Sequence, residues 1–284
     1  MNTNRINNAV ILTLLSMGLA ACGGGGGTVS TQSTGNNDLD AAALAAQVKQ
    51  SKRHTVQNPE GLLADGYQIT IDGKTYKVGE KVDISALPNG FSQHGYSIKD
   101  AAYLSDGVVH KEDYVGTLQV YQQPYSYVLG NLLRAQIRNN SGVEEPINQF
   151  TVDGVGGLAT ATDKIPKAGM FTYNGIAFTK GQQGQLSYAV NFDQSVGSGV
   201  ITGLADTGKI TLNEGRISNQ SIGGINQVGV TATSISEKLG SGKYQLGFFG
   251  PNAEEIAGVV HHDQFIDKGA TLPDDYDVGF AGQR

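Results

Sequence analysis

The sequence contains a single cysteine, Cys22, and no tryptophan in its 284 residues. One cysteine cannot form an internal disulfide bond, so the folded body must be stabilised by apolar burial and hydrogen bonds alone. Acidic residues outnumber basic ones, which gives a net charge of −6, and no cluster of lysine and arginine is present. Nucleic-acid binding depends on cationic side chains that displace counterions from phosphates, so we expect no nucleic-acid partner.

The chain lacks an apolar run long enough to cross a bilayer, which needs about 20 residues. Residues 9–19 are apolar and follow Arg5, a shorter pattern that is typical of a secretory signal. Small residues then lead directly to Cys22, and this arrangement resembles the bacterial lipobox, in which the signal is cleaved and the thiol acylated. We predict a signal peptide over residues 1–21 and lipid attachment at Cys22; the alternative is an ordinary signal with an incidental cysteine.

Glycine is abundant, with 40 residues, and a run of glycines follows the cysteine directly. Such a run has no side chains to pack, so residues 22–60 are predicted to form a flexible tether. Within the tether, Asp40 is placed to cap a helix, and Ala41, Leu44 and Val48 follow at helical spacing. The pattern predicts one short helix there.

From about Tyr67 onward, apolar and polar residues alternate with a period of two, which is typical of half-buried strands. Asp72-Gly73 and Asn174-Gly175 each predict a tight hairpin turn, and Gly197-Ser198-Gly199 predicts another turn. Residues 91–114 show no firm period. The fold class is therefore mainly β, either a barrel or a sandwich. We prefer an up-and-down barrel, because closure removes the exposed strand edges.

Several segments of the second half resemble the C-terminal barrel of the factor H-binding protein family. The closing segments are the most telling, because residues 242–258 resemble a signature shared with transferrin-binding protein B and the haemophilin haemophores. The resemblance to the barrel is carried by residues 148–157, 172–178, 184–192, 242–258 and 278–284, and residues 118–126 are similar to a strand that ends the N-terminal domain in the same group.

The resemblance implies an N-terminal β-rich handle domain over residues 61–145 and an antiparallel eight-stranded β-barrel over residues 146–284. It also implies a lipid-anchored protein on the outer surface of the outer membrane that captures a host ligand and is not an enzyme. We expect a monomer.

Haem or haemoglobin is the first ligand expected, because histidines and tyrosines gather in the handle. His94, His110, Tyr96 and Tyr114 are the candidate haem residues, since imidazole ligates iron and aromatic rings can cover a porphyrin. The alternative is that these are ordinary surface side chains. Adjacent residues point to opposite faces of a strand, so His261-His262 is expected in a solvated loop, and no metal is expected beyond haem iron.

No pattern of catalytic residues is present. Asp274-Asp275-Tyr276-Asp277 offers carboxylates without a partner base, and no nucleophile elbow precedes a helix. The tyrosine-rich segment 121–127 fits either a strand at the junction of the two domains or a binding surface, and Pro124 favours an edge or a bulge. The alternatives to haem are binding of a host serum protein such as complement factor H and, last, a structural role in the envelope.

Overall fold

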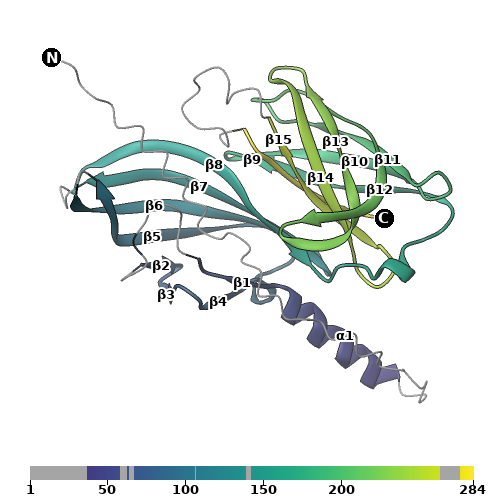
Figure 1. The fold of residues 1–284 in the computed structure, drawn as a ribbon, viewed down its shortest axis with the longest axis horizontal. Helices are drawn as coiled ribbons and strands as arrows, with labels where there is room; N and C mark the ends of the chain where they lie inside the picture. Colours follow the sequence, from purple (N-terminus) through teal and green to yellow (C-terminus); the bar gives the residue numbers. More distant parts are fainter. Residues whose placement is uncertain (1–36, 58–62, 64–66, 106, 139–141, 263–275) are drawn as a thin grey trace.

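The computed structural model describes residues 37–57, 63, 67–105, 107–138, 142–262 and 276–284. A curved sheet on one side joins a closed barrel on the other (Figure 1). The predicted mainly β fold with an antiparallel eight-stranded barrel is confirmed. The segment predicted as a signal peptide, Cys22 and the glycine run lie outside the described residues, and no described helix is long and apolar enough to span a membrane.

The helix α1 spans Asn37–Ser51 and confirms the expected helix, but the N-cap predicted at Asp40 is wrong, because Asp40 lies inside the helix. The chain after it was predicted to remain tether, but it is built into the fold instead. Strand β1 (Arg53–Thr55) pairs with β4 (Lys81–Asp83), and β4 runs into a short 3-10 helix, η1 (Ile84–Ala86). Alternate residues of this segment point inward, so Lys52, His54 and Val56 are each at most 2% exposed.

The curved sheet, which we call the handle sheet, has six strands in the order β3-β2-β5-β6-β7-β8, and Figure 1 shows these strands side by side. The predicted hairpin at Asp72-Gly73 is confirmed, because both residues have positive φ, 46° and 81°, between β2 and β3. The six strands are β2 (Gln68–Ile71), β3 (Lys74–Lys77), β5 (Gly90–Ser105), β6 (Val108–Gln122), β7 (Ser126–Arg138) and β8 (Glu144–Gly157).

The region without a firm period forms the long hairpin β5–β6. Its register shifts between Ile98 and Ala101, and Asp100 there has a φ of 52°. A bulge exchanges the two faces of a strand, so the inward positions before and after it do not share one alternation. The missing period therefore reflects the bulge.

Strands β9 to β16 close the barrel in the order β10-β11-β12-β13-β14-β15-β16-β9. Their inward side chains form one apolar core, with Tyr188, Leu246, Phe248 and Phe280 all fully or almost fully buried. The eight strands are β9 (Met170–Thr179), β10 (Gln182–Asn191), β11 (Val196–Thr202), β12 (Ile210–Ile222), β13 (Ile225–Ser236), β14 (Gly240–Phe249), β15 (Glu255–His261) and β16 (Val278–Gln283).

Two of the predicted turns are wrong, because their glycines serve close packing inside strands. Asn174-Gly175 lies within β9, where a Cβ on Gly175 would come within 2.1 Å of the Ala281 carbonyl oxygen of β16. Gly197 and Gly199 lie within β11, where a side chain would meet the buried ring of Tyr188. Glycine in a strand interior often marks such a close approach.

Strand β8 joins the handle sheet by pairing with β7, so the expected division between residues 145 and 146 falls inside a strand. The barrel begins after β8, at β9. A shared apolar cluster holds the two parts together, with Phe150 from β8 packed against Phe178 from β9, and Phe249 and Ala257 nearby. This junction orients the handle sheet relative to the barrel.

Candidate functional site

His94, the first haem candidate, lies on β5 at the end of the β2–β3 hairpin. Its Nε2 is 2.9 Å from the Ser92 hydroxyl and its Nδ1 is 2.5 Å from Asp72 Oδ2. Both ring nitrogens therefore take part in hydrogen bonds within the handle, and the side chain is 14% exposed. An iron ligand needs a ring nitrogen with an available lone pair, so haem would have to displace one of these contacts.

Tyr96 points into the core of the handle sheet and is 4% exposed. Its hydroxyl donates to Asn131 Oδ1 over 2.9 Å, and Gly116 on the neighbouring strand leaves room for the ring. Burial raises the pKa of this hydroxyl well above its ordinary value. Since a tyrosine binds iron as the phenolate, a raised pKa makes Tyr96 a poor ligand.

Tyr114 belongs to a polar cluster around the buried Glu112 on β6. Glu112 accepts hydrogen bonds from Tyr114 (2.7 Å) and Tyr103 (3.0 Å), and Arg138 lies 3.9 Å from it. Burial, with the carboxylate beside it, raises the pKa of Tyr114 far above 10. His110 stacks on Tyr103, with ring centroids 5.3 Å apart. These aromatic side chains thus complete a cluster within the sheet.

The four haem candidates do not share one site. His110 pairs across the hairpin with Tyr103, which is nine residues beyond His94 along β5. At roughly 3.3 Å per residue, the two imidazoles are separated by about 30 Å of strand. A single iron cannot be ligated from both positions. No group of three or more His, Cys, Asp or Glu among the described residues could hold a metal ion.

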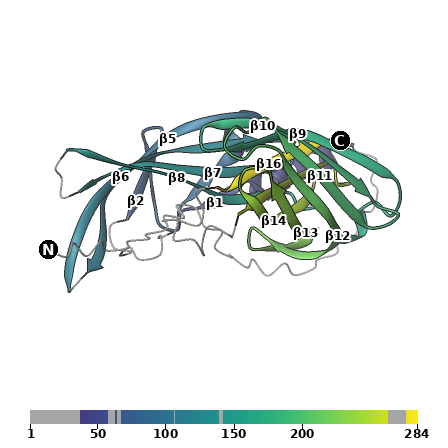
Figure 2. The ribbon, with the colours of Figure 1, turned by 90° about the horizontal axis from the view of Figure 1, so that it is seen from above.

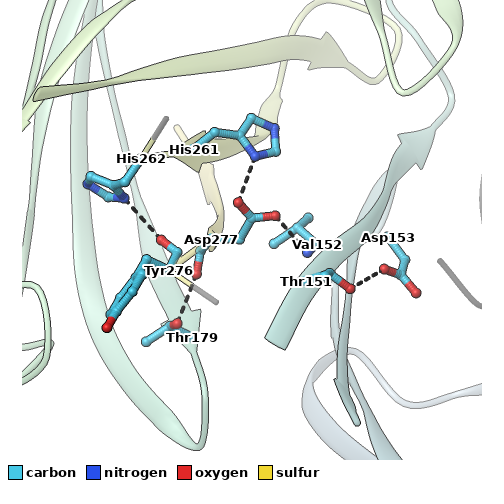
Figure 3. A network of polar contacts seen from close by, with 8 residues as sticks. All are labelled: Thr151, Val152, Asp153, Thr179, His261, His262, Tyr276 and Asp277. Atoms are coloured by element: carbon cyan, nitrogen blue, oxygen red, sulfur yellow. Dashed lines mark hydrogen bonds and ion pairs between the residues drawn. The ribbon is translucent and has the colours of Figure 1, made fainter. Parts of the chain in front are cut away.

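The second histidine pair lies at the end of the barrel (Figure 3). His261 Nδ1 is 2.7 Å from Asp277 Oδ1, and Asp277 Oδ2 accepts from the Val152 backbone N–H over 3.0 Å. His262 Nδ1 is 3.0 Å from the Tyr276 carbonyl oxygen, and this histidine is 1% exposed. The solvated loop predicted for the pair is therefore wrong. The two side chains do point apart, and Asp277 links the barrel to β8; Asp274 and Asp275 lie outside the described residues.

The tyrosine-rich segment 121–127 lies at the junction, which agrees with the structural interpretation, and Pro124 lies in the turn between β6 and β7. Glu255 of the barrel accepts from the Tyr125 backbone N–H over 3.1 Å and from the Ser126 hydroxyl over 2.8 Å. Burial raises the pKa of this carboxyl group, although its hydrogen bonds and nearby Lys52 oppose the shift.

Lys52 completes this junction from the end of α1. It is 2% exposed and its ammonium donates to the Gln123 carbonyl oxygen. Burial lowers its pKa to about 8, against the opposing charge of Glu255. Sequence reasoning missed both residues, because neither stands in a motif; only its position just after the helix sets Lys52 apart.

Two solvent-facing surfaces remain as candidate binding surfaces. At the far end of the hairpin β5–β6, Leu104 and Val109 face each other across the strands and are 61% and 53% exposed. On the barrel, the exterior of β9 to β13 carries mainly small uncharged side chains, with Glu214 and Arg216 on β12 as its charged residues. Exposed apolar or uncharged patches of this kind are where soluble proteins meet partners.

The fold and these sites define a class: a β protein in which a curved sheet is fused to a closed barrel, with candidate surfaces for binding. Residues 163–260 match the family model described as factor H binding protein, C-terminal. The resemblance recognised in the sequence is thus confirmed for the barrel.

Solved structures of transferrin-binding protein B are also similar. An intact Ap-TbpB with N and C lobes aligns with a TM-score of 0.43 and 17% identity, over 81% of this chain and 43% of that chain. A double mutant from Haemophilus parasuis Hp5 aligns at 0.42 and 15%, over 81% and 46%. The isotype 1 protein from serogroup B Neisseria meningitidis aligns at 0.42 and 14%, over 77% and 43%. The chain spans less than half the length of these proteins.

Proposed function

We propose that this protein is a lipid-anchored lipoprotein of the outer membrane, exposed on the cell surface, that binds a host protein of the complement-regulator class represented by factor H. The observation that carries the proposal is the match of residues 163–260 to the factor H binding protein family model. These residues form most of the barrel, including all of β9 to β14 and nearly all of β15.

Haem or haemoglobin, the ligand that the histidines favour, has less support. His94 and His110 lie about 30 Å apart along the strands, and the hydroxyls of Tyr96 and Tyr114 are engaged in buried hydrogen bonds. We therefore favour a host serum protein over haem as the ligand.

The test immobilises residues 28–284 and passes purified factor H and purified transferrin over separate surfaces. We expect saturable capture of factor H and little capture of transferrin. The absence of any saturable binding to factor H would contradict the proposal. A parallel titration with haemin is expected to leave the Soret band of free haemin unchanged. A stoichiometric shift of this band would instead support haem as the ligand.

The anchor and the location are tested in cells. Metabolic labelling with palmitate is expected to mark the wild-type chain and not the Cys22→Ala variant, which also controls for non-specific labelling. Protease added to intact cells is expected to digest the wild-type chain. Protection from protease, together with no capture of a host protein, would instead support a structural role within the envelope.

A further inference from the structure

Over the whole chain 16% of residues are charged, but one part of the barrel exterior carries few of them. Strands β9, β10, β11 and β13 contain no Asp, Glu, Lys or Arg, and β12 between them contains only Glu214 and Arg216. In the handle, by contrast, each of the strands β5 to β8 carries at least two charged residues. Charge is therefore sparse across these five neighbouring strands, and the shorter strands β2 and β16 also lack charged residues.

Strand register places the outward side chains of this group in rows. The central row crosses all five strands through Asn174, Ser187, Val200, Thr211 and Ile235. We call the exterior of β9 to β13 around this row the neutral face. At about 4.8 Å between strands, the row extends for roughly 19 Å.

The neutral face is open to solvent. In its central row, Asn174, Ser187, Thr211 and Ile235 are exposed and Val200 is half-buried. The strands β11 and β12 lie on the side of the barrel away from the handle sheet (Figures 1 and 2). The junction with the sheet is made chiefly by β15 and β16, and Phe178 of β9 and Ile222 of β12 also belong to its apolar cluster.

Such a surface is suited to protein contact. The centres of protein interfaces are depleted of charged residues, because each charge must lose its water on binding. Thr, Ser and Asn offer donors and acceptors that can adapt to a partner, and their short side chains lose little rotamer freedom when ordered. A partner can therefore cover this face without desolvating an ammonium or a carboxylate at its centre.

We infer that the host protein docks on the neutral face, and this inference rests on the proposed function. The partner surface that fits has hydroxyl, amide and aliphatic groups at its centre and no concentrated charge. All five strands lie within residues 163–260, the segment that matches the family model. The inference also predicts that binding is insensitive to salt, because no ion pair carries it.

Two substitutions in the central row test the inference, each with a matched control on the handle. Val200→Glu and Thr211→Arg place a charge at neighbouring positions of the row; Val109→Glu and Thr75→Arg make the same changes at exposed handle positions. We expect the two face variants to weaken capture of factor H at least about tenfold, since each buries an unpaired charge, and the two controls to change it less than about twofold.

Wild-type affinity is expected to change less than about threefold between 50 and 300 mM NaCl. Thermal melting of all four variants separates lost binding from lost folding, because a folded variant keeps the wild-type transition.

The outcomes are distinguishable. No capture by the wild type refutes the proposed function itself. Capture that survives in folded face variants but is lost in Val109→Glu overturns this inference alone and assigns binding to the end of β5–β6. Light scattering of the wild type provides a further check: a dimer that Thr211→Arg dissociates would make the neutral face a contact between copies, which also overturns the inference.

Discussion

The handle sheet and the barrel use their polar side chains in opposite ways. In the handle, the buried carboxylate of Glu112 accepts hydrogen bonds from Tyr103 and Tyr114, and the exposed Arg138 lies 3.9 Å from it. In the barrel, the core is almost entirely apolar, and the outer face of β9 to β13 presents mainly uncharged groups, with Glu214 and Arg216 as its charged residues. Tyrosine and carboxylate groups, which often mark a ligand site, are therefore hydrogen-bonded to one another in the handle. The exposed surface of the barrel consists mainly of residue types that carry no such signal.

The lesson is that a residue's chemistry is available only if its bonding groups are not already used. Histidine and tyrosine in the handle predict a haem site by type, yet Tyr96 and Tyr114 complete hydrogen bonds inside the sheet. A surface of Ser, Thr, Asn and Val contains no sequence motif that predicts binding. These residues form one surface because the strand register brings residues that are far apart in the chain side by side.

The largest expected effect tests whether the barrel depends on its apolar core. Phe248 is fully buried, with ring centroids 5.7 Å from Phe192 and 6.3 Å from Tyr173. Phe248→Ala should lower the free energy of unfolding by about 3–5 kcal/mol, measured by urea denaturation. The control Leu104→Ala, at a side chain that is 61% exposed, should change it by less than about 0.5 kcal/mol. Equal effects would contradict the assigned core.

The handle is tested at its polar cluster. Glu112→Ala removes the acceptor of Tyr103 and Tyr114 and leaves a buried hydroxyl without that partner. We expect a loss of about 2–3 kcal/mol in the free energy of unfolding. Lys111→Ala, at the adjacent exposed position, should cost almost nothing. If Glu112→Ala proved neutral, the contrast between an internally bonded handle and an apolar barrel would lose its basis.

Closure of the barrel depends on close backbone contact between β9 and β16. A Cβ at Gly175 would clash with the Ala281 carbonyl oxygen, so Gly175→Ala should destabilise by about 1–3 kcal/mol. Gly95 on the handle has no atom within 4 Å of its Cβ position, and Gly95→Ala is the matched control. Calorimetric melting of both variants compares them, and the reverse ranking would refute the glycine's role in closure.

The smallest expected effect concerns the junction between the two parts. Burial lowers the pKa of Lys52 to about 8, so between pH 8 and 9.5 the folded chain binds fewer protons at this site than the unfolded chain. Stability should therefore rise with pH in this window. We expect the unfolding free energy of the wild type, relative to Lys52→Met, to increase by about 1.5 kcal/mol.

The matched control for this window is Lys49→Met, at an exposed position on the same helix. Its difference from the wild type should not vary with pH. If the difference between the wild type and Lys52→Met also did not vary with pH, Lys52 would have its ordinary pKa. Water would then reach this side chain at the junction.

Much of the fold is predictable from the sequence, because it depends on local patterns. Alternation of apolar residues predicts β10 and the other regular barrel strands, and Asp72-Gly73 predicts a hairpin through its positive φ values. Asn174-Gly175 is the same kind of dipeptide, yet it lies in mid-strand. Whether a glycine turns the chain or admits a neighbouring backbone depends on β16, which lies about a hundred residues away.

The candidate site is less predictable, for the same reason. Lys52 and Glu255 are separated by most of the chain and meet only because β15 lies against the turn between β6 and β7. The neutral face likewise requires the closed strand order, since Ser187, Val200 and Thr211 are neighbours only through pairing across three strands. Non-local pairing, which no single motif encodes, creates both.

We expect the host protein to bind to the barrel and not to the handle. Hydroxyl-radical footprinting of the chain with and without bound factor H tests it most directly, because the exposed Met170, beside the neutral face, and Ile235 within it can be oxidised, as can Leu104 and Val109 on the handle. We expect the oxidation of Ile235 and Met170 to fall in the complex and that of Leu104 and Val109 to stay unchanged. Protection of Leu104 and Val109 with Ile235 and Met170 unaffected would contradict it.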